Sequence, residues 1–402
     1  MNLWVRSNES RRGTFGEPKH DWSDLKVAYI VSMTDGLQSF VYREIRELRS
    51  HGVLVVVLPT RVGRGPYMPP KDWPVDRPTL VRVVGAHLRF VKDSVGRYVK
   101  TLLEAVRTNS IVDFILAVFF AEAISRRNLK QIHCHFGDHK LFIAYLSGIL
   151  TGRPVSATIH AYELYDNPNP RMFRHVLSKI DAIVTIAEHN RSILTATWGA
   201  PPDKISVVPM FADIPLDLRH ESNDQGKVII LTVGRLVEKK GHLTLLRAIS
   251  RLPKNYEAWL VGSGPLDVEA LATRLGVADR VRFFGRVSGS ELDQLYRRAD
   301  VFCLPSETAK TGDREGIPVA LMEAMAHALP VVATRHAGIP ELVEEILVAE
   351  RNPEELSIAL LRLGRDPELR RRSGQRNSQI VRSRFSRDNV LLLKSIFERL
   401  VS

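Results

Sequence analysis

Short apolar segments alternate with longer segments of helical periodicity from Lys26 onward. In the first half of the chain the apolar segments are rich in β-branched residues and cover residues 27–31, 53–58, 131–136, 155–160, 182–186 and 204–209. Such alternation is typical of parallel strands joined by helical crossovers. Because strands this continuously apolar are expected where helices cover both faces of a sheet, the pattern predicts a doubly wound α/β domain.

The alternation restarts after a polar stretch, which predicts a second domain of the same kind. Further apolar segments follow at residues 228–234, 257–262, 280–285, 300–305 and 329–334, and a basic helical region runs from Glu368 to Ser402. The expected organisation is a disordered polar tail (1–25), an N-terminal Rossmann-like domain (26–212), a linker (213–227), a C-terminal Rossmann-like domain (228–385) and a helix that returns to the first domain (386–402).

Two facing domains of this type enclose a cleft lined by the carboxyl ends of their strands, where ligands bind. In VGRLVEKKGH a strand ends at Gly234 and a helix begins near Gly241. Arg235 and Lys240 therefore lie beside a helix N-terminus, whose free N–H groups favour a phosphate. The two cations indicate a diphosphate site; a solvated basic loop is the alternative.

Two carboxylates, Glu315 and Glu323, stand eight positions apart in EGIPVALMEAMAHALPVVAT. A glycosidase pair stands roughly 5 to 10 Å apart, whereas eight helical residues rise about 12 Å. We therefore expect them to contact different parts of one extended ligand, Glu315 the hydroxyls of a sugar and Glu323 those of a ribose. Gly316, before Ile317 and Pro318, allows close backbone approach. An ordinary amphipathic helix with exposed glutamates is the alternative.

His160 ends a buried strand, where it can face the cleft and donate a hydrogen bond to a ligand hydroxyl. A satisfied structural histidine is the alternative. Gly262, in VGSGPL, has only the start of a dinucleotide loop, but it suits a tight turn near a nucleotide. Gly36 follows the first strand, either near a diphosphate or acceptor or in a plain connection.

The segment HCHFGDHK contains potential metal ligands, namely His133, Cys134, His135, Asp138 and His139. His133 and His135 share one face of a strand. The spacing does not match a tetrahedral site, and ligands on opposite faces cannot converge. Packing and lining of the cleft are therefore favoured over a metal site.

Composition and charge narrow the class of partner. The 402 residues are 44% hydrophobic and 25% charged, so sizeable cores can form. Lys and Arg number 57 against 45 Asp and Glu, a net charge of +12, which indicates an anionic partner: nucleic acid, an acidic membrane surface or a phosphorylated small molecule. Two distant cysteines, Cys134 and Cys303, favour a reducing compartment. The N-terminus lacks an apolar signal segment, and the most apolar run, 111–124, is too short to span a membrane.

The positive surplus gathers in two regions. Residues 81–130 hold nine Lys or Arg against four Asp or Glu, and residues 370–402 hold nine against two. The first region combines cations with apolar helical stretches, so we expect a peripheral contact with anionic lipid, with a solvated face as the alternative. Nucleic acid is not expected, because no basic motif with interleaved aromatic residues is present.

Together these motifs resemble the retaining GT-B glycosyltransferases of family 4 (glycosyltransferase group 1), and among them bacterial enzymes that build exopolysaccharides of the colanic-acid type. The resemblance runs from about Lys26 to the C-terminus and is carried by VGRLVEKKGH, LVGSGPL, residues 283–306 and DREGIPVALMEAMAHALPVVATRHAGIPELV. It implies two Rossmann-like domains facing across a cleft, with 26–212 as the acceptor domain and 228–385 as the donor-nucleotide domain. It also implies no metal, because cationic side chains and helix dipoles do its work. No other cofactor is implied, because the nucleotide diphosphate sugar is a substrate.

The resemblance assigns the diphosphate to Arg235 and Lys240, the ribose to Glu323, the base to the backbone near Arg286 and Val287, and the donor sugar to His160, Glu315 and the 316–318 backbone. The candidate catalytic residues are His160, Arg235, Lys240 and Glu315, and the candidate donor-binding residues are Gly36, Arg235, Lys240, Gly262, Arg286, Val287, Glu315, Gly316, Ile317, Pro318 and Glu323.

Three positions depart from the family pattern. Gln38 stands where the first loop often has Glu, and Glu163 stands where Asp is frequent. After Val343 the family usually continues with a glycine-containing turn, whereas here Glu344 and Glu345 run straight into the next apolar segment. We expect a shortened or rebuilt turn beside the donor pocket.

The expected activity is transfer of a hexosyl unit from a UDP- or GDP-sugar to a saccharide or lipid-linked saccharide acceptor in surface or exopolysaccharide synthesis, with retention at the anomeric carbon. The alternatives are a GT-B-shaped sugar-nucleotide epimerase or phosphorylase, which would use the same cleft, and a non-catalytic polyanion-binding protein. The expected location is the cytoplasm, with peripheral contact at the inner face of the cell membrane.

Overall fold

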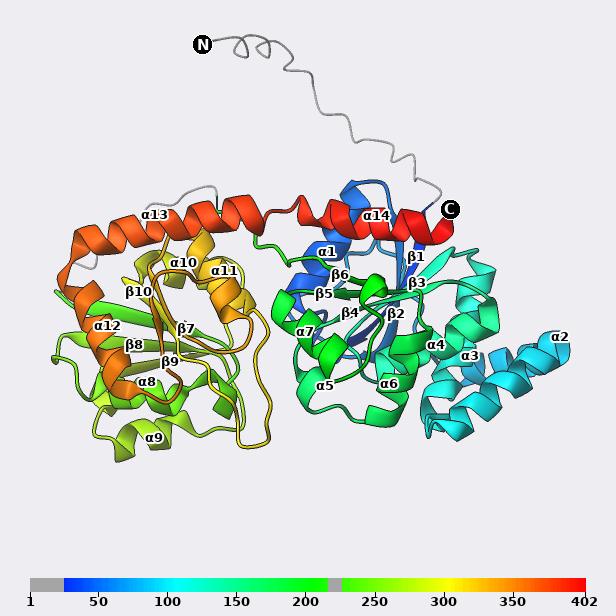
Figure 1. The fold of residues 1–402 in the computed structure, drawn as a ribbon, viewed down its shortest axis with the longest axis horizontal. Coiled ribbons are helices and arrows are strands. Elements are labelled where there is room, and N and C mark those ends of the chain that lie inside the picture. The colour runs from blue at the N-terminus through cyan, green and yellow to red at the C-terminus, as the bar shows by residue number, and fades with distance from the viewer. Residues whose placement is uncertain (1–24, 216–225) are drawn as a thin grey trace, which may run out of the picture.

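Two parallel six-stranded sheets, flanked by helices, form the two halves of the molecule in the computed structural model (Figure 1). The structure describes residues 25–215 and 226–402. The predicted polar tail (1–25) lies outside the described residues except for Leu25, as does most of the predicted linker (213–227).

The first sheet has the strand order β2-β1-β3-β4-β5-β6, and its pairs are parallel. Its strands are β1 (Lys26–Met33), β2 (Leu54–Val62), β3 (Gln131–His135), β4 (Val155–Ile159), β5 (Ala182–Thr185) and β6 (Ile205–Val207). Its helices are α1 (Ser39–Ser50), α2 (Leu80–Arg107), α3 (Ile111–Arg126), α4 (His139–Thr151), α5 (Tyr162–Tyr165), α6 (Pro170–Lys179), α7 (Glu188–Ala196) and the 3-10 turn η1 (Pro202–Lys204). Every residue of β3 and β4 is buried, as expected for strands covered on both faces.

The second sheet has the order β12-β11-β10-β7-β8-β9 and is also parallel. Its strands are β7 (Val228–Val233), β8 (Tyr256–Val261), β9 (Val281–Gly285), β10 (Val301–Leu304), β11 (Val331–Thr334) and β12 (Leu347–Val348). Its helices are α8 (His242–Ile249), α9 (Val268–Arg274), α10 (Ser290–Arg298), α11 (Val319–Ala326), α12 (Pro353–Arg365) and α13 (Pro367–Arg384), with 3-10 turns η2 (Glu238–Lys240), η3 (Ala278–Arg280) and η4 (Ile339–Glu341).

The last helix, α14 (Asn389–Val401), returns to the first domain, as predicted. Helices α13 and α14 run along one side of both halves in Figure 1. Phe397 of α14 is fully buried in the apolar cluster on one side of the first sheet, with its ring 6.3 Å from that of Tyr29. This returning helix and the two doubly wound sheets confirm the predicted fold class.

Each sheet has a point where the strand order reverses, and ligands of such sheets bind there, outside the carboxyl ends of the strands. In the first sheet the reversal lies between β1 and β3, and in the second between β7 and β10. The two halves also share an apolar cluster, because Ile186, Ala187 and Ala212 pack with Ile317 and other core residues of the second half. The segments after β5 and β6 of the first sheet therefore pack against the second half, close to the loop that precedes α11.

Within the described residues, no helix has both the length and the apolarity needed to cross a membrane. The apolar run at 111–124 forms most of α3, which is largely buried against the first sheet. Helix α2 packs on α3 and forms the end of the molecule farthest from the second half (Figure 1).

Candidate functional site

The loops at the reversal point of the second sheet pack backbone against backbone. A Cβ atom at Gly241, whose φ is +68°, would lie 1.8 Å from the carbonyl oxygen of Pro305 after β10. A Cβ atom at Gly262, after β8, would lie 1.8 Å from the carbonyl oxygen of Gly234 after β7. Glycine is required at both places by a close approach and a positive φ. The same packing brings the 235–241 loop beside the 305–318 loop.

Lys240 and Glu315 meet at this reversal point. The Lys240 Nζ atom lies 2.9 Å from Glu315 Oε1, and both side chains are about nine-tenths buried. Burial opposes ionisation of Glu315, but the ammonium groups of Lys240 and Lys239 together hold its pKa below the usual range. The pair places a fixed carboxylate and a fixed ammonium group just before α8, whose N-terminus begins after Gly241.

Two further side chains support Glu315. Lys239, which the sequence analysis did not single out, is buried and donates to Asp313 Oδ1 at 3.0 Å and to the Arg314 carbonyl at 3.1 Å. His336 Nε2 accepts from the Glu315 backbone amide at 3.1 Å. The other ring nitrogen of His336, Nδ1, lies 2.6 Å from Glu350 Oε1, which orients the ring. Lys239 and His336 thus both fix the position of the loop before α11.

Arg235, unlike Lys240, forms no ion pair within the described residues. Its side chain is exposed, and its guanidinium makes none of the ion pairs or hydrogen bonds found among residues 25–215 and 226–402. Its carbonyl accepts from His242 Nε2 at 3.2 Å, which ties the loop to the first turn of α8. A free cation therefore stands beside the start of a helix, as an anion site requires.

The loop before α11 also contacts the first domain. A Cβ atom at Gly316 would lie 3.1 Å from Ile186 Cδ1 and 3.5 Å from Ala161 Cβ. Ala161 directly follows His160, so the Glu315 loop packs against the His160 loop at the boundary between the two domains. Ile317 is buried in the shared apolar cluster, and Pro318 is the N-cap residue of α11.

His160 ends a chain of buried polar groups. Its Nε2 atom lies 3.1 Å from His135 Nδ1, and His135 Nε2 lies 2.8 Å from Glu44 Oε1 on α1. Tyr29 donates its hydroxyl to the same carboxylate oxygen at 2.8 Å. Burial, together with the nearby His135 and Lys140, holds the pKa of His160 well below its ordinary value, so the ring is neutral.

Glu163 joins the two strand-end loops of the first sheet. Its Oε1 atom accepts from the backbone amides of His160 at 2.7 Å and Gly137 at 3.0 Å, whereas its Oε2 atom is buried without a hydrogen-bond partner. Burial raises the pKa of Glu163 from 4.5 to about 7 despite these amide donors. Glu163, at a position where the sequence departs from the family pattern, thus ties the backbone at His160 to the backbone of the loop after β3.

Glu323 is paired across the cleft with Arg43 of α1. The Arg43 guanidinium donates to Glu323 Oε1, and the Tyr296 hydroxyl donates to Oε2 at 3.2 Å. Arg43 is 5% exposed and the Glu323 side chain 19% exposed. A ribose that used this carboxylate would have to share it with Arg43 or displace it.

The rim of the cleft brings together further predicted positions. Arg286 donates to Ser263 Oγ at 2.6 Å and lies 3.6 Å from Asp35 Oδ1, next to Gly36 of the first domain. Val287 is partly buried against the core of the second domain. Gly36 has a φ of +72°, and Leu37 after it donates its amide to Tyr67 O at 2.9 Å. The rim therefore consists of loops after β1, β8 and β9.

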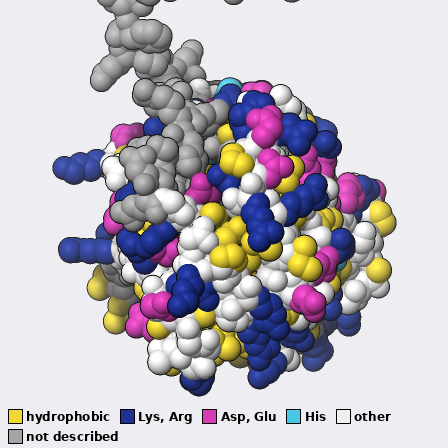
Figure 2. Space-filling view, turned by 90° about the vertical axis from the view of Figure 1, so that its left-hand side faces the viewer, with side chains coloured by type: hydrophobic (Ala, Val, Ile, Leu, Met, Phe, Trp, Pro, Cys, Tyr) yellow, Lys and Arg dark blue, Asp and Glu magenta, His cyan; other side chains and the backbone are white. Residues whose placement is uncertain are grey.

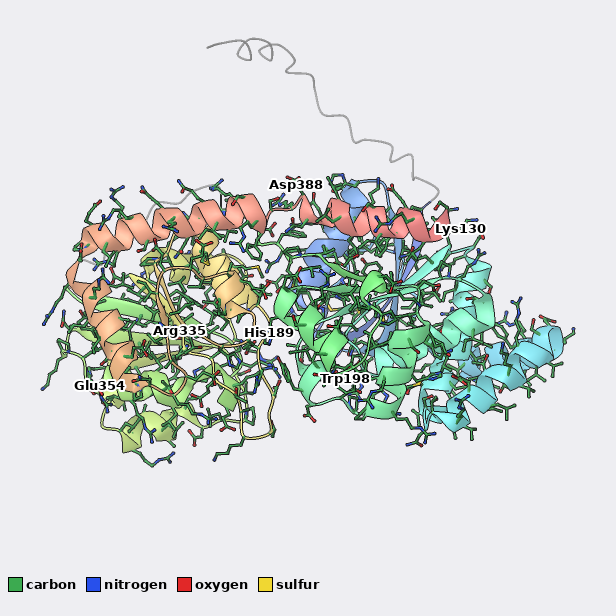
Figure 3. The ribbon with its side chains drawn as sticks, in the orientation of Figure 1. Lys130, His189, Trp198, Arg335, Glu354 and Asp388 are labelled. Atoms are coloured by element: carbon green, nitrogen blue, oxygen red, sulfur yellow. The ribbon has the colours of Figure 1, made fainter. Side chains whose placement is uncertain are left out.

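The segment after Val343 is held by α13 and not by a glycine turn. Arg376 lies 3.2 Å from Glu344 and 3.5 Å from Glu345, and Arg384 lies 2.9 Å from Glu344. Just upstream, the Glu341 carboxylate accepts from the first backbone amides of α7 in the other domain, at 2.9 Å and 2.7 Å. One of these amides belongs to His189, which is labelled between the two halves in Figure 3.

The potential metal ligands of the 133–139 segment are engaged in separate contacts. His133 hydrogen bonds to Ser156 and Thr158, Asp138 caps α4, and His139 lies 2.8 Å from Asp113. His133, His135 and Glu44 do have ligand atoms within 4.8 Å of one another. Cys134 faces away from them, with its thiol 3.9 Å from the Ser156 carbonyl.

Residues that contact the site from outside the strand-end loops could not be singled out from the sequence. Three such residues lie on helices: Arg43, Tyr296 and Asn190. The Asn190 amide donates to the His160 carbonyl at 2.6 Å. In the sequence, the polar positions of these helices are indistinguishable from those of an ordinary exposed face. Of the missed residues, only Lys239 could have been suspected from the sequence, because it adjoins Lys240 in the same loop.

Comparisons with known proteins match both halves of the chain. Residues 34–214 match the model described as Glycosyltransferase Family 4, and residues 227–366 match the model described as Glycosyl transferases group 1. The amylovoran biosynthesis glycosyltransferase AmsK of Erwinia amylovora is 36% identical over 51% of this chain and 51% of its own length. The putative colanic acid biosynthesis glycosyltransferase WcaL of Salmonella typhimurium is 32% identical over 58% of this chain and 60% of its own length. The matched region thus spans about half to three-fifths of these curated relatives.

Solved structures share the fold. HepE of Anabaena, crystallised with UDP and glucose, superposes with a TM-score of 0.72 at 18% identity, covering 94% of this chain and 100% of HepE. WaaG, a glycosyltransferase involved in lipopolysaccharide biosynthesis, superposes with a TM-score of 0.65 at 16% identity, covering 92% and 99%. At these identities the likeness establishes the fold alone. With both family models matched in order along the two halves, this chain belongs to the family 4 (group 1) glycosyltransferases of the GT-B fold.

Proposed function

We propose that the chain transfers a hexosyl unit from a UDP- or GDP-sugar to a saccharide or lipid-linked saccharide acceptor in exopolysaccharide or surface-polysaccharide synthesis, with retention at the anomeric carbon. One observation carries the proposal. Lys240 pairs with Glu315 in the second domain, and the loop that holds Glu315 packs against the His160 loop of the first domain at Gly316. AmsK and WcaL, by their names, act in the biosynthesis of such polymers.

The donor diphosphate would lie against Arg235, Lys240 and the N-terminus of α8. Arg235 offers its charge without breaking an existing pair, and Lys240 can turn from Glu315 toward a phosphate oxygen. Glu315 would then accept from hydroxyls of the donor sugar. Because two cations and a helix N-terminus stabilise the leaving diphosphate, the proposal includes no metal.

Retention follows if the acceptor hydroxyl attacks the anomeric carbon from the face that the nucleotide leaves. The bond to the diphosphate oxygen breaks, the new glycosidic bond forms, and the departing phosphate takes the acceptor proton. Catalysis then rests on positioning and on stabilising the diphosphate, without a protein nucleophile.

His160 would contact the donor sugar as an acceptor of a hydrogen bond. Because Glu44 accepts from His135 Nε2, the His135 Nδ1 atom is left to accept from His160 Nε2. This order leaves the proton of neutral His160 on Nε2 and a lone pair on Nδ1. A sugar hydroxyl would therefore donate to Nδ1, the reverse of the donation expected from the sequence.

A screen of UDP- and GDP-sugars, with and without saccharide acceptors, tests the proposal. NMR of the product should show the donor's anomeric configuration in a new glycosidic bond, and EDTA should leave the rate unchanged. Sugar-nucleotide isomerisation without an acceptor, or release of a sugar phosphate with inorganic phosphate, would instead support the epimerase or phosphorylase alternative.

A further inference from the structure

Helix α2 carries a row of aliphatic side chains that faces solvent. Its members lie three or four residues apart along the helix, apart from adjacent Leu80 and Val81, and have exposed fractions of 45% to 82%: Leu80, Val81, Val84, Leu88, Val91, Val95, Val99, Leu103 and Val106. The opposite side of the helix, with Ala86, Thr101 and Ala105, is buried against α3 and α4. We name the exposed row the α2 apolar row.

The row continues past a kink. Ser94 has non-helical backbone angles, and the bend lets His87 Nδ1 and the Tyr98 hydroxyl meet at 2.9 Å over Phe114 of α3. Both halves of α2 are therefore anchored from below while their outer sides remain uncovered. The first turn of α3 adds Ile111 and Val112, which are 49% and 74% exposed. Contiguous apolar surface of this kind marks an interaction site.

Unpaired cations flank the α2 apolar row. Lys92, Lys100 and Arg107 are exposed and take part in none of the ion pairs found among the described residues. Asp93 is the one fully exposed acidic residue on α2, because Glu104 is half-buried and lies next to His175. A positive margin around an apolar row matches an anionic lipid surface.

The other basic region does not share these properties. Its arginines are largely matched to carboxylates of this chain, as in Arg370 with Asp300, Arg371 with Glu368, Arg376 and Arg384 with Glu344, and Arg387 with Asp213. No large hydrophobic side chain of α13 is exposed, and α14 exposes only Leu391, Leu392 and Val401, at 41%, 50% and 39%. On the end of the molecule opposite α2, cations and anions are interspersed (Figure 2). The two surpluses therefore differ in degree: four of the six arginines of α13 pair with carboxylates, whereas α2 pairs Arg82 and Arg89 but leaves Lys92, Lys100 and Arg107 without an ion pair among the described residues.

We propose that α2 docks the protein on an anionic lipid bilayer, with the α2 apolar row inserted at the headgroup boundary and Lys92, Lys100 and Arg107 facing lipid phosphates. A second copy of this chain fits less well. In a two-fold symmetric contact through α2, the cationic margins of the two copies would face each other. The docking requires neither donor nor acceptor, so its failure would leave the proposed transfer activity untouched.

Co-sedimentation with vesicles tests the proposal on the full chain. The vesicles contain phosphatidylcholine alone or phosphatidylcholine with 30% phosphatidylglycerol. Leu88→Gln/Leu103→Gln removes two apolar contacts and is matched by Ile358→Gln/Leu392→Gln, whose side chains are 62% and 50% exposed elsewhere.

A second pair of variants separates charge from insertion. Lys92→Gln/Lys100→Gln/Arg107→Gln removes the flanking charge and is matched by Lys254→Gln/Arg274→Gln/Arg365→Gln, three exposed cations of the second domain. All four variants alter exposed side chains only, so the far-UV spectrum and melting temperature should stay unchanged.

The wild type and both controls should bind the anionic vesicles and release them at high salt. Each α2 variant should lower the partition coefficient on the order of 10-fold or more. Equal binding by α2 variants and controls, or no preference of the wild type for anionic vesicles, would overturn the proposal. A dimer that Leu88→Gln/Leu103→Gln dissociates, without vesicle binding, would overturn it too and would assign the row to an interface between copies.

Discussion

Replacing Glu163 by Gln should change how the stability of the protein depends on pH. Glu163 is fully buried, and its pKa is raised from 4.5 to about 7 because burial disfavours its charge. Its Oε1 atom accepts two backbone amides, a task that the Gln oxygen can also perform. Gln removes the charge while keeping the shape and those two contacts.

The sign follows from proton binding in the two states. Below pH 4.5 the carboxyl is protonated in both the folded and the unfolded chain, so it contributes no pH dependence. Between pH 4.5 and about 7 the unfolded chain loses the proton, whereas the folded chain keeps it. The free energy of unfolding therefore falls as pH rises through this range. Above it both states are ionised, and the loss of stability stays constant. Since one pKa unit corresponds to about 1.4 kcal/mol, the loss amounts to about 3 kcal/mol.

Urea unfolding followed by circular dichroism at several pH values measures the effect. Other titrating groups are common to both proteins and cancel in the difference. Glu163→Gln should therefore gain about 2 to 3 kcal/mol relative to the wild type between pH 4.5 and pH 8.5. Glu291→Gln, at an exposed position of α10, is the matched control. Parallel stability curves for wild type and Glu163→Gln would refute the reasoning.

Three further changes test the site. Gly241→Ala should cost about 3 kcal/mol and lower the melting temperature by several degrees, since its Cβ would lie 1.8 Å from the Pro305 carbonyl oxygen; an unchanged melting temperature would contradict this packing. Arg43→Met should tighten the binding of a nucleotide sugar several-fold by freeing Glu323, whereas weaker binding in calorimetry would show that Arg43 assists the donor. Arg235→Met should leave stability within about 0.5 kcal/mol but lower the transfer rate about 100-fold or more, and full activity in a coupled assay would remove Arg235 from the mechanism.

The strands and the donor-side loops could be predicted because local sequence determines them. Each run of β-branched residues formed a strand, since only a sheet covered by helices can bury so continuous an apolar segment. The proximity of Lys240 and Glu315 also follows from topology, because both follow strands that flank a reversal of strand order.

Contacts between the two domains could not be predicted in this way. Arg43 and Glu323 are 280 residues apart, and their pairing depends on how the domains close. The order of groups from Glu44 through His135 to His160 likewise depends on side-chain packing between α1 and two strands. The sequence pointed to His135, His160 and Glu323, but it gave no reason to single out Arg43 or Glu44.

The direction in which α2 faces was also beyond the sequence. Its periodic valines and leucines predict a helix but look the same whether they face a core or the solvent. In the folded protein the buried side of α2 contains small residues such as Ala86 and Ala105, and the larger aliphatic side chains face solvent.

Calorimetric titration of UDP and GDP, and of their sugars, tests the central claim most directly. At least one nucleotide should bind to the wild type. The double variant Arg235→Ala/Lys240→Ala should weaken that binding about 100-fold, whereas the control Lys254→Ala/Arg274→Ala should leave it unchanged. Undiminished binding by Arg235→Ala/Lys240→Ala would contradict the diphosphate site on which the proposed transfer rests.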